Sequence, residues 1–173
     1  MPANVEIKAR VKDLTQLKNR AESLSDTPMQ VILQEDTFFN IPKGRLKLRV
    51  LAPDYAQLVW YSRADDTGPK RSDYQIHETS DPESLKSILA LALGVRGVVR
   101  KTRYLYLVGQ TRIHLDDVEG LGHFMELEVV MQPGQSDTEG QAIAESLMKK
   151  LGIDSTDLLD GAYMDMIELV NGK

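Results

Sequence analysis

Cysteine and long apolar runs are both absent from this 173-residue sequence. Without cysteine there are no disulfide bonds and no thiol nucleophiles, and such a composition is easiest to reconcile with a cytoplasmic protein. No apolar stretch approaches the length needed to cross a bilayer, and the N-terminus lacks the apolar core of a signal peptide. We therefore predict a soluble, cytoplasmic protein that has no membrane partner.

Positively charged residues are fewer than negatively charged ones, with 21 Lys and Arg against 26 Asp and Glu, so the formal net charge is -5 at pH 7. This deficit argues against nucleic acid as a partner, although it leaves room for a local basic cluster. A chain of this length can bury a core without disulfide or metal staples, so we predict a single domain over residues 1–173. The composition leaves the oligomeric state open, and a homodimer is compatible with it.

Histidine is the third scarce residue type, with only three in the chain. His77, His114 and His123 are scattered and do not have the spacing of a zinc site. We assign them surface or packing roles, and no Ser-His-Asp constellation is visible.

Hydrophobic periodicity alternates between two and 3.6 along the chain. Period-two segments predict strands near residues 4–11, 33–41, 45–51, 56–63, 70–78, 96–108, 110–117 and 123–131. Helical spacing predicts helices after Asp13, from Pro82 to a closing Gly94, before a closing Gly152, and over residues 163–170. The turn-rich segments 65–69 and 132–137 should be the softest parts of the chain.

Several predicted strands carry charge on one face only. These faces hold Glu6, Lys8 and Arg10; Arg45, Lys47 and Arg49; Lys101 and Arg103; Arg112, His114 and Asp116; and Glu126 with Glu128. On any single strand the usual explanation is a solvated face of an antiparallel sheet. Eight strands, however, are enough to close a barrel whose interior admits side chains or one small ligand.

Amphipathic helices must pack on an apolar surface. If they cover the apolar strand faces from outside, the charged faces meet in the lumen, and Val5, Ile7, Leu46, Leu48 and Leu127 lie under helices. We therefore predict an α+β fold, an eight-stranded antiparallel closed β-barrel with helices packed outside. Buried Lys and Arg need compensation by carboxylates, metal ions or an anionic ligand. A polyphosphate fits, because guanidinium groups bind its oxygens bidentately while Glu or Asp hold a hard divalent cation.

Short motifs along most of the chain support this interpretation. NVEIK matches the end of the pattern E-x-E-x-K, and GRLKLR, LVWYSR and VVRKTRYLY each match a further block. The most specific segment, LDDVEGLGHFMELE, matches L-D-x-V-x-x-L-G-x-F-x-E-x-E, and AYMDMI is similar to Y-x-D-L-L. In this order the motifs resemble the CYTH family of triphosphate tunnel metalloenzymes, which includes class IV adenylate cyclases, thiamine triphosphatases and inorganic tripolyphosphatases.

The resemblance implies a role for each matching residue. The implied substrate-binding residues are Lys8, Lys47, Arg49, Arg63, Lys101 and Arg103; the implied metal ligands are Glu6, Glu126 and Glu128; the implied catalytic residues are Glu6, Lys8 and Asp116. The implied cofactor is Mg²⁺ or Mn²⁺. The implied partner is a small molecule that contains a triphosphate, such as tripolyphosphate, thiamine triphosphate or ATP.

One position departs from the family pattern, since Asn4 stands where the first glutamate is expected. An uncharged amide should weaken at least one metal position. We first predict a metal-dependent enzyme that hydrolyses inorganic or organic triphosphates. The alternatives are a class IV-type adenylate cyclase that makes cyclic AMP and pyrophosphate from ATP, and a non-catalytic binder of polyphosphate or nucleotides.

Overall fold

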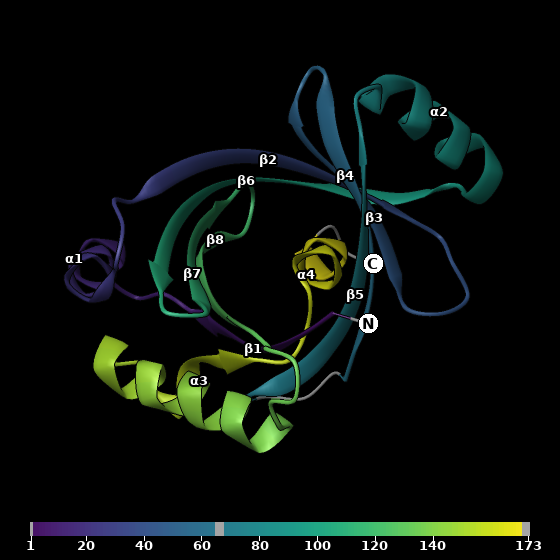
Figure 1. The fold of residues 1–173 in the computed structure, drawn as a ribbon. Helices are drawn as coiled ribbons and strands as arrows, with labels where there is room; N and C mark the ends of the chain where they lie inside the picture. Colours follow the sequence, from purple (N-terminus) through teal and green to yellow (C-terminus); the bar gives the residue numbers. More distant parts are fainter. Residues whose placement is uncertain (1, 65–67, 171–173) are drawn as a thin grey trace.

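The computed structural model describes residues 2–64 and 68–170, and its strands form a closed ring (Figure 1). The strands are β1 (Ala3–Arg10), β2 (Gln30–Phe39), β3 (Arg45–Ala52), β4 (Tyr55–Arg63), β5 (Lys70–Thr79), β6 (Val95–Val108), β7 (Thr111–Val118) and β8 (Gly122–Val130). They follow one another in the order β5-β4-β3-β2-β6-β7-β8-β1, and an additional pairing of β5 with β1 closes the ring. The pairings are antiparallel, so the predicted barrel is confirmed.

Strand β1 is the point at which the barrel closes. It pairs with β8 from Asn4 to Arg10, and its first half, from Ala3 to Glu6, also pairs with β5. Beyond that point a two-residue strand, β9 (Leu158–Leu159), takes the place of β5 beside Lys8 and Ala9. Sequence periodicity could not predict β9, because two residues are too few to show an alternation.

The helix starts predicted after Asp13 and at Pro82, and the helix ends predicted before Gly94 and Gly152, are those that the structure shows. Helix α1 (Leu14–Leu24) follows Asp13, whose side chain accepts a hydrogen bond from the Gln16 amide. Helix α2 (Pro82–Leu93) is capped by Asp81, and α3 (Asp137–Leu151) begins with a capping box of Ser136 and Glu139. These side chains satisfy amides that the first helical turn leaves unpaired.

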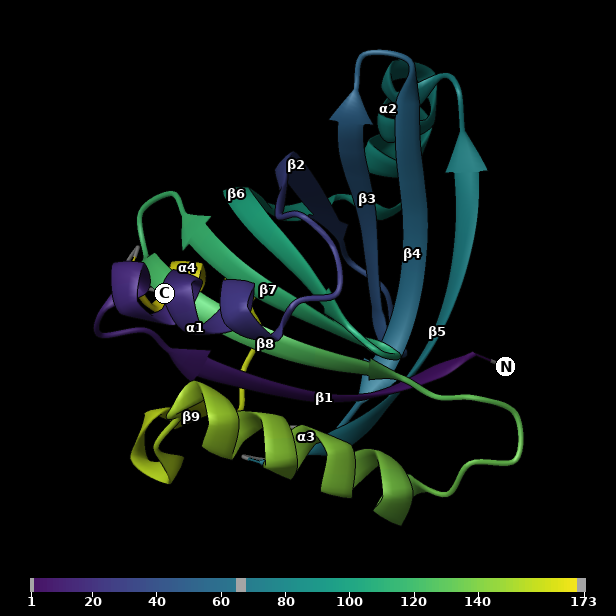
Figure 2. The same cartoon turned by 60° about the vertical axis from the view of Figure 1, so that its left-hand side comes forward.

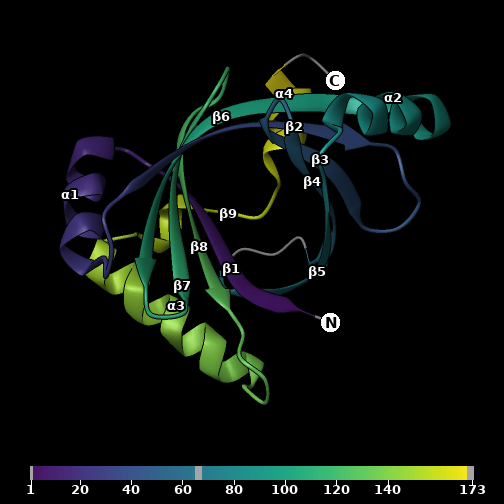
Figure 3. The same cartoon turned by 45° about the horizontal axis from the view of Figure 1, so that its top comes forward.

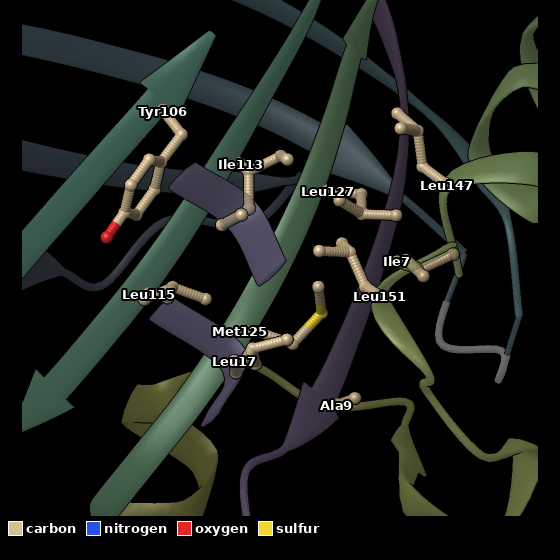
Figure 4. Close-up of a cluster of buried hydrophobic side chains, with 11 residues drawn as sticks. Ile7, Ala9, Leu17, Tyr106, Ile113, Leu115, Met125, Leu127, Leu147 and Leu151 are labelled. Atoms are coloured by element: carbon tan, nitrogen blue, oxygen red, sulfur yellow. The ribbon is translucent and has the colours of Figure 1, made fainter. Parts of the chain in front are cut away.

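Helices α1 and α3 cover the outer face of β1, β7 and β8 (Figure 2). Figure 4 shows Leu147 and Leu151 of α3 beside Leu127 and Ile7 of the barrel wall, and Leu17 of α1 beside Met125, within one buried apolar cluster. Burying an aliphatic side chain of this size stabilises the fold by about 1.5–3 kcal/mol. The apolar faces of the strands therefore point outward, under helices.

Helix α2 performs the same function on the opposite side of the ring. Leu85 and Leu89 of α2 pack against Leu46 and Leu48 of β3. On the α3 side of the ring, Val5 of β1 packs against Ala144 in the same way. In Figure 3, β7, β8 and β1 run side by side next to α3, while α2 lies beyond the far ends of β2 and β6. Because the apolar faces point outward, alternate side chains must point into the ring.

The last helix, α4 (Tyr163–Val170), stands inside the ring in the view of Figure 1. Its Asp165 carboxylate receives hydrogen bonds from Arg45 of β3 and Arg96 of β6, at distances of 2.7–3.2 Å. Arg45, which shares a predicted charged face with Lys47 and Arg49, therefore binds α4 instead of lining the central cavity.

Most observed strand boundaries lie within one or two residues of the predicted ones, and the start of β2 differs most. Strand β2 begins at Gln30, three residues before the predicted start, and the first part of the predicted soft segment 65–69 lies outside the described residues. Residues 131–136 join β8 to α3, and the last residue of the predicted soft segment 132–137 is the first of that helix. In the described part of the chain, no helix has the length and apolar character that crossing a membrane requires.

Candidate functional site

A cavity of about 320 Å³ occupies the lumen of the barrel. Its lining takes side chains from every strand from β1 to β8, together with Ala162 and Tyr163 at the beginning of α4. This volume is at the lower end of the roughly 300–1,000 Å³ of small-molecule sites. The structure brings together on this lining the candidate residues Glu6, Lys8, Lys47, Arg49, Arg63, Lys101, Arg103, Glu126 and Glu128.

One side of the cavity is cationic and is organised by Asp36 of β2. Strand register places Asp36 opposite Arg49. The Nε and one terminal nitrogen of Arg49 each donate a hydrogen bond of 2.8 Å to an oxygen of the Asp36 carboxylate. The amines of Lys101 and Lys47 lie 3.5 and 3.9 Å from the same carboxylate. We call Asp36, Lys47, Arg49 and Lys101 the cationic pole.

The electrostatics of the cationic pole follow from burial. Asp36 is only 1% exposed, and burial alone would raise the pKa of its carboxyl, but the charges of Arg49, Lys101 and Lys47 lower this pKa far below its usual value. For Lys101, burial and the charge of Arg103 lower the pKa to about 8 in spite of Asp36. Burial also lowers the pKa of Lys47 well below its usual value. A bound oxyanion would stabilise the charged forms of both amines.

The opposite side, on β1 and β8, is rich in carboxylates. Glu6 lies opposite Glu128 in the strand register. Glu126 lies two residues before Glu128, on the same face of β8. Burial and the charge of Glu128 raise the pKa of Glu6 to about 7, although Arg63 lies 3.7 Å away. We call Glu6, Glu126 and Glu128 the acidic pole.

Glu126 differs from Glu6 in its partners. The amine of Lys8 and the guanidinium of Arg103 lie 3.7 and 3.8 Å from one of its oxygens. Although burial alone would raise the pKa of Glu126, these two charges lower it well below its usual value. Burial lowers the pKa of Lys8 to about 8, against the effect of Glu126. Within the acidic pole, Glu6 therefore has the least compensated carboxylate.

Asp116 stands apart from the other candidate residues, because it lies behind Arg103 and off the cavity lining. Its two oxygens accept hydrogen bonds of 2.8 Å from the Arg103 guanidinium, and the Tyr163 hydroxyl donates another of 2.9 Å. The ring of Tyr163 also contacts the amines of Lys8 and Lys101, at 3.8 and 4.8 Å from its centroid. The contacts of Asp116 thus orient an arginine that reaches the cavity.

Three residues at this site, Asp36, Tyr163 and His114, were not among the site residues predicted from the sequence. Asp36 has the same alternation as the residues that were found, but its partners depend on the register between β2 and β3. Tyr163 reaches the lumen from a helix, and only the AYMDMI motif signalled it. His114, to which we assigned a surface or packing role, is 2% exposed and lies on the cavity lining.

The acidic pole was tested as a site for a divalent cation. Among the described residues, no three carboxylate or imidazole side chains gather closely enough to hold a metal ion by themselves. However, the Asn4 side-chain oxygen is buried without a hydrogen-bond partner in the described residues, and Asn4 is a residue of the cavity lining two positions before Glu6. Mg²⁺ is commonly held by one or two carboxylates plus the phosphates of the substrate. The oxygens of Asn4, Glu6 and Glu128 fit a cation that completes its coordination with phosphate oxygens.

Comparison with known proteins identifies relatives over nearly the whole chain. The family model of the CYTH domain matches residues 2–163. A protein of Aeromonas hydrophila named adenylate cyclase CyaB is 26% identical over 174 residues, which cover 95% of this chain and 88% of that protein. The structure of PH1012 from Pyrococcus horikoshii OT3 is 24% identical, with a TM-score of 0.83 and coverage of 94% of this chain and 98% of the other.

A further structure has the same fold at lower identity. It is that of HpAC1 from Hippeastrum, which is 17% identical and covers 100% of this chain and 97% of the other, with a TM-score of 0.65. That protein is described as an adenylyl cyclase candidate with a dominant triphosphatase activity.

Proposed function

Because the chain belongs to the CYTH family, we propose that it binds a triphosphate in the barrel lumen and hydrolyses it with the help of a divalent metal ion. The observation that carries this proposal is the charge of a single cavity, whose lining has seven Lys and Arg side chains against four Asp and Glu side chains. A triphosphate chain carries several negative charges in a row and would neutralise this excess.

Two arginines are already oriented for such a ligand. Asp36 binds Arg49, and Asp116 binds Arg103, in each case through Nε and one terminal nitrogen. The second terminal nitrogen of each guanidinium takes no part in these bonds and can donate to phosphate oxygens. Fixing the arginines in advance reduces the conformational entropy that binding must overcome. In this proposal Asp116 is a positioning residue that acts through Arg103.

The remaining candidate residues divide between the phosphates and the metal. Lys8, Lys47, Arg63 and Lys101 would neutralise the chain of phosphates, while Glu6 and Glu128, with Glu126 beside them, would hold Mg²⁺ or Mn²⁺. When bound, this cation would supply Lewis-acid polarisation of the phosphoryl group. The acidic pole would thus provide negative charge for a cation, in a cavity whose other charged side chains attract anions.

Cyclisation of ATP is a second candidate, and the adenylate cyclase name of the Aeromonas hydrophila relative favours it. In that reaction the ribose 3′-hydroxyl, instead of water, attacks the α-phosphate. The products separate the two reactions, because hydrolysis of ATP yields ADP and phosphate while cyclisation yields cyclic AMP and pyrophosphate.

The decisive experiment is product analysis on tripolyphosphate, thiamine triphosphate and ATP, each with Mg²⁺ and with Mn²⁺. We expect phosphate release from at least one of them, and loss of triphosphate binding in Arg103→Ala. Arg100→Ala is the matched control, because Arg100 lies on the same strand with its side chain 55% exposed and paired with Glu35. Cyclic AMP as the main product would favour the cyclase. Binding without turnover under every condition would replace the enzyme with a triphosphate-binding protein.

A further inference from the structure

His114 occupies the middle of the lumen face of β7, between Arg112 and Asp116. Strand register places it in a row with Glu126 of β8 and Lys8 of β1. The neighbouring row consists of Arg112, Glu128 and Glu6 on the same three strands. His114 and Arg112 therefore hold equivalent positions, each beside a glutamate of the acidic pole.

The two equivalent positions differ in their bonding. Arg112 pairs with Glu128 at 3.4 Å, whereas both ring nitrogens of His114 are buried without a hydrogen-bond partner in the described residues. Its neighbour Glu126 lies close to Lys8 and Arg103 instead. Buried polar groups are nearly always hydrogen-bonded, so an imidazole with two unpaired nitrogens needs an explanation.

The charges around His114 determine what its ring can do. Burial and the charge of Arg103 hold the pKa of His114 well below its usual value, although Asp116 and Glu126 oppose this effect. A neutral imidazole has one N–H donor and one acceptor nitrogen. In a cavity where most of the other donors are cations, His114 offers an uncharged donor whose direction the strand fixes.

We propose that His114 is a substrate-binding residue whose ring N–H donates a hydrogen bond to a phosphate oxygen of the bound chain. This inference rests on the proposed function, since it assumes that phosphates enter the lumen. Two observations carry it: both ring nitrogens of His114 lack a hydrogen-bond partner in the described residues, and the His114 side chain is part of the cavity lining together with Arg103 and Arg112, which would attract phosphate oxygens. The cost of burying an unpaired imidazole in the free protein would be recovered when the ligand binds.

The test compares two substitutions of similar size by calorimetric titration with tripolyphosphate in the absence of metal. His114→Leu removes the donor, and we expect binding about ten-fold weaker than in the wild type, the effect of one lost hydrogen bond to a charged group. His114→Gln retains an N–H donor and should bind within about three-fold of the wild type. His77→Leu, on an exposed position of β5, is the control and should bind unchanged.

Thermal unfolding of the free proteins separates binding from packing. Because leucine leaves no unpaired polar atom in the cavity wall, His114→Leu should melt at the same temperature as the wild type or higher. A residue needed only for packing would show the reverse, with a lower melting temperature and similar tripolyphosphate affinity. That outcome, or wild-type affinity in a folded His114→Leu, would overturn the inference.

Imidazole ¹⁵N spectra provide a direct measurement, because the chain has only three histidines to assign. Tripolyphosphate should shift one N–H signal of His114 and leave His77 and His123 unchanged. If the wild type binds tripolyphosphate while the His114 signals do not move, this inference fails and the proposed function stands. If the wild type does not bind tripolyphosphate at all, both fail.

Discussion

The cationic pole and the acidic pole lie in the same cavity, yet the pKa values of their carboxyl groups are shifted in opposite directions. Asp36 and Glu6 are both buried, and burial alone would raise the pKa of each. Three cations close to Asp36 overcome this effect and lower its pKa, whereas Glu6 faces a second glutamate and its pKa rises to about 7. Burial acts in the same direction on both carboxyls, so the neighbouring charges account for the opposite shifts of their pKa values.

This difference gives the two poles different ligand preferences. The cationic pole has more positive charge than Asp36 can neutralise, so it attracts oxyanions. At the acidic pole, Lys8 and Arg103 lie beside Glu126, whereas Glu6 and Glu128 face each other across two strands, and a cation bound between them would relieve their repulsion. A phosphate chain that carries a divalent cation has both kinds of charge and matches both poles at once.

Removing the charge of the acidic pole should have the largest effect. In a Glu126→Gln and Glu128→Gln double variant, we expect metal-dependent turnover to fall on the order of a hundred-fold or more, because the amides keep the size but lose the charge that holds the cation. Metal-free tripolyphosphate binding should persist or tighten, since repulsion is lost. Assays of turnover and calorimetry on the same preparation make this check, and equal losses in both would contradict the separation of the poles.

Removing an arginine of the phosphate site should have the converse effect. We expect Arg49→Ala and Arg103→Ala each to weaken metal-free triphosphate binding by about 1.5–3 kcal/mol, the cost of a charge-assisted contact. Titration calorimetry measures the loss, with Arg100→Ala as the matched control. Unchanged affinity in both variants would place the phosphate site elsewhere.

Adding a carboxylate to the acidic pole sharpens the comparison. Asn4→Glu places a third charge beside Glu6, and we expect roughly ten-fold tighter Mn²⁺ binding, with a gain in turnover if the metal site limits the wild type. Electron paramagnetic resonance of free Mn²⁺ measures the affinity, and Asn4→Gln controls for side-chain length. If Asn4→Glu binds metal more tightly and remains inactive on every triphosphate, the hydrolase and cyclase proposals both lose support.

A change of pH should produce the smallest effect, at the cationic pole. The pKa of Lys101 is lowered to about 8, so its charge is present below that pH and is lost as the pH rises through it. We expect metal-free tripolyphosphate affinity to fall roughly two- to five-fold between pH 7.5 and 9 as this charge disappears. In Lys101→Arg, which stays charged over this range, the fall should be smaller. An identical pH profile in the two proteins would remove Lys101 from the phosphate site.

Alternation of polar and apolar residues was sufficient to predict the barrel and the lumen face of most strands. Lys47 and Arg49 could be placed in the cavity because each follows an apolar residue that packs under α2. Alternation identifies a face but not a partner. The pairing of Asp36 with Arg49 depends on strand register, which a single sequence does not specify, and the approach of Tyr163 depends on where α4 ends up after the barrel is complete.

The position of β1 in the ring has a consequence for the kinetics of folding. The first strand of the chain pairs with residues 70–73 and with residues 124–130, so the contacts that complete the ring span most of the sequence. Contacts of such long range slow folding, because the chain must form large loops before it gains the contacts that close them. During synthesis, β5 leaves the ribosome well before β8, so β1 can have both of its neighbours only after β8 has emerged. The strand that carries Asn4, Glu6 and Lys8 is therefore among the first to be synthesised and among the last to complete its pairing.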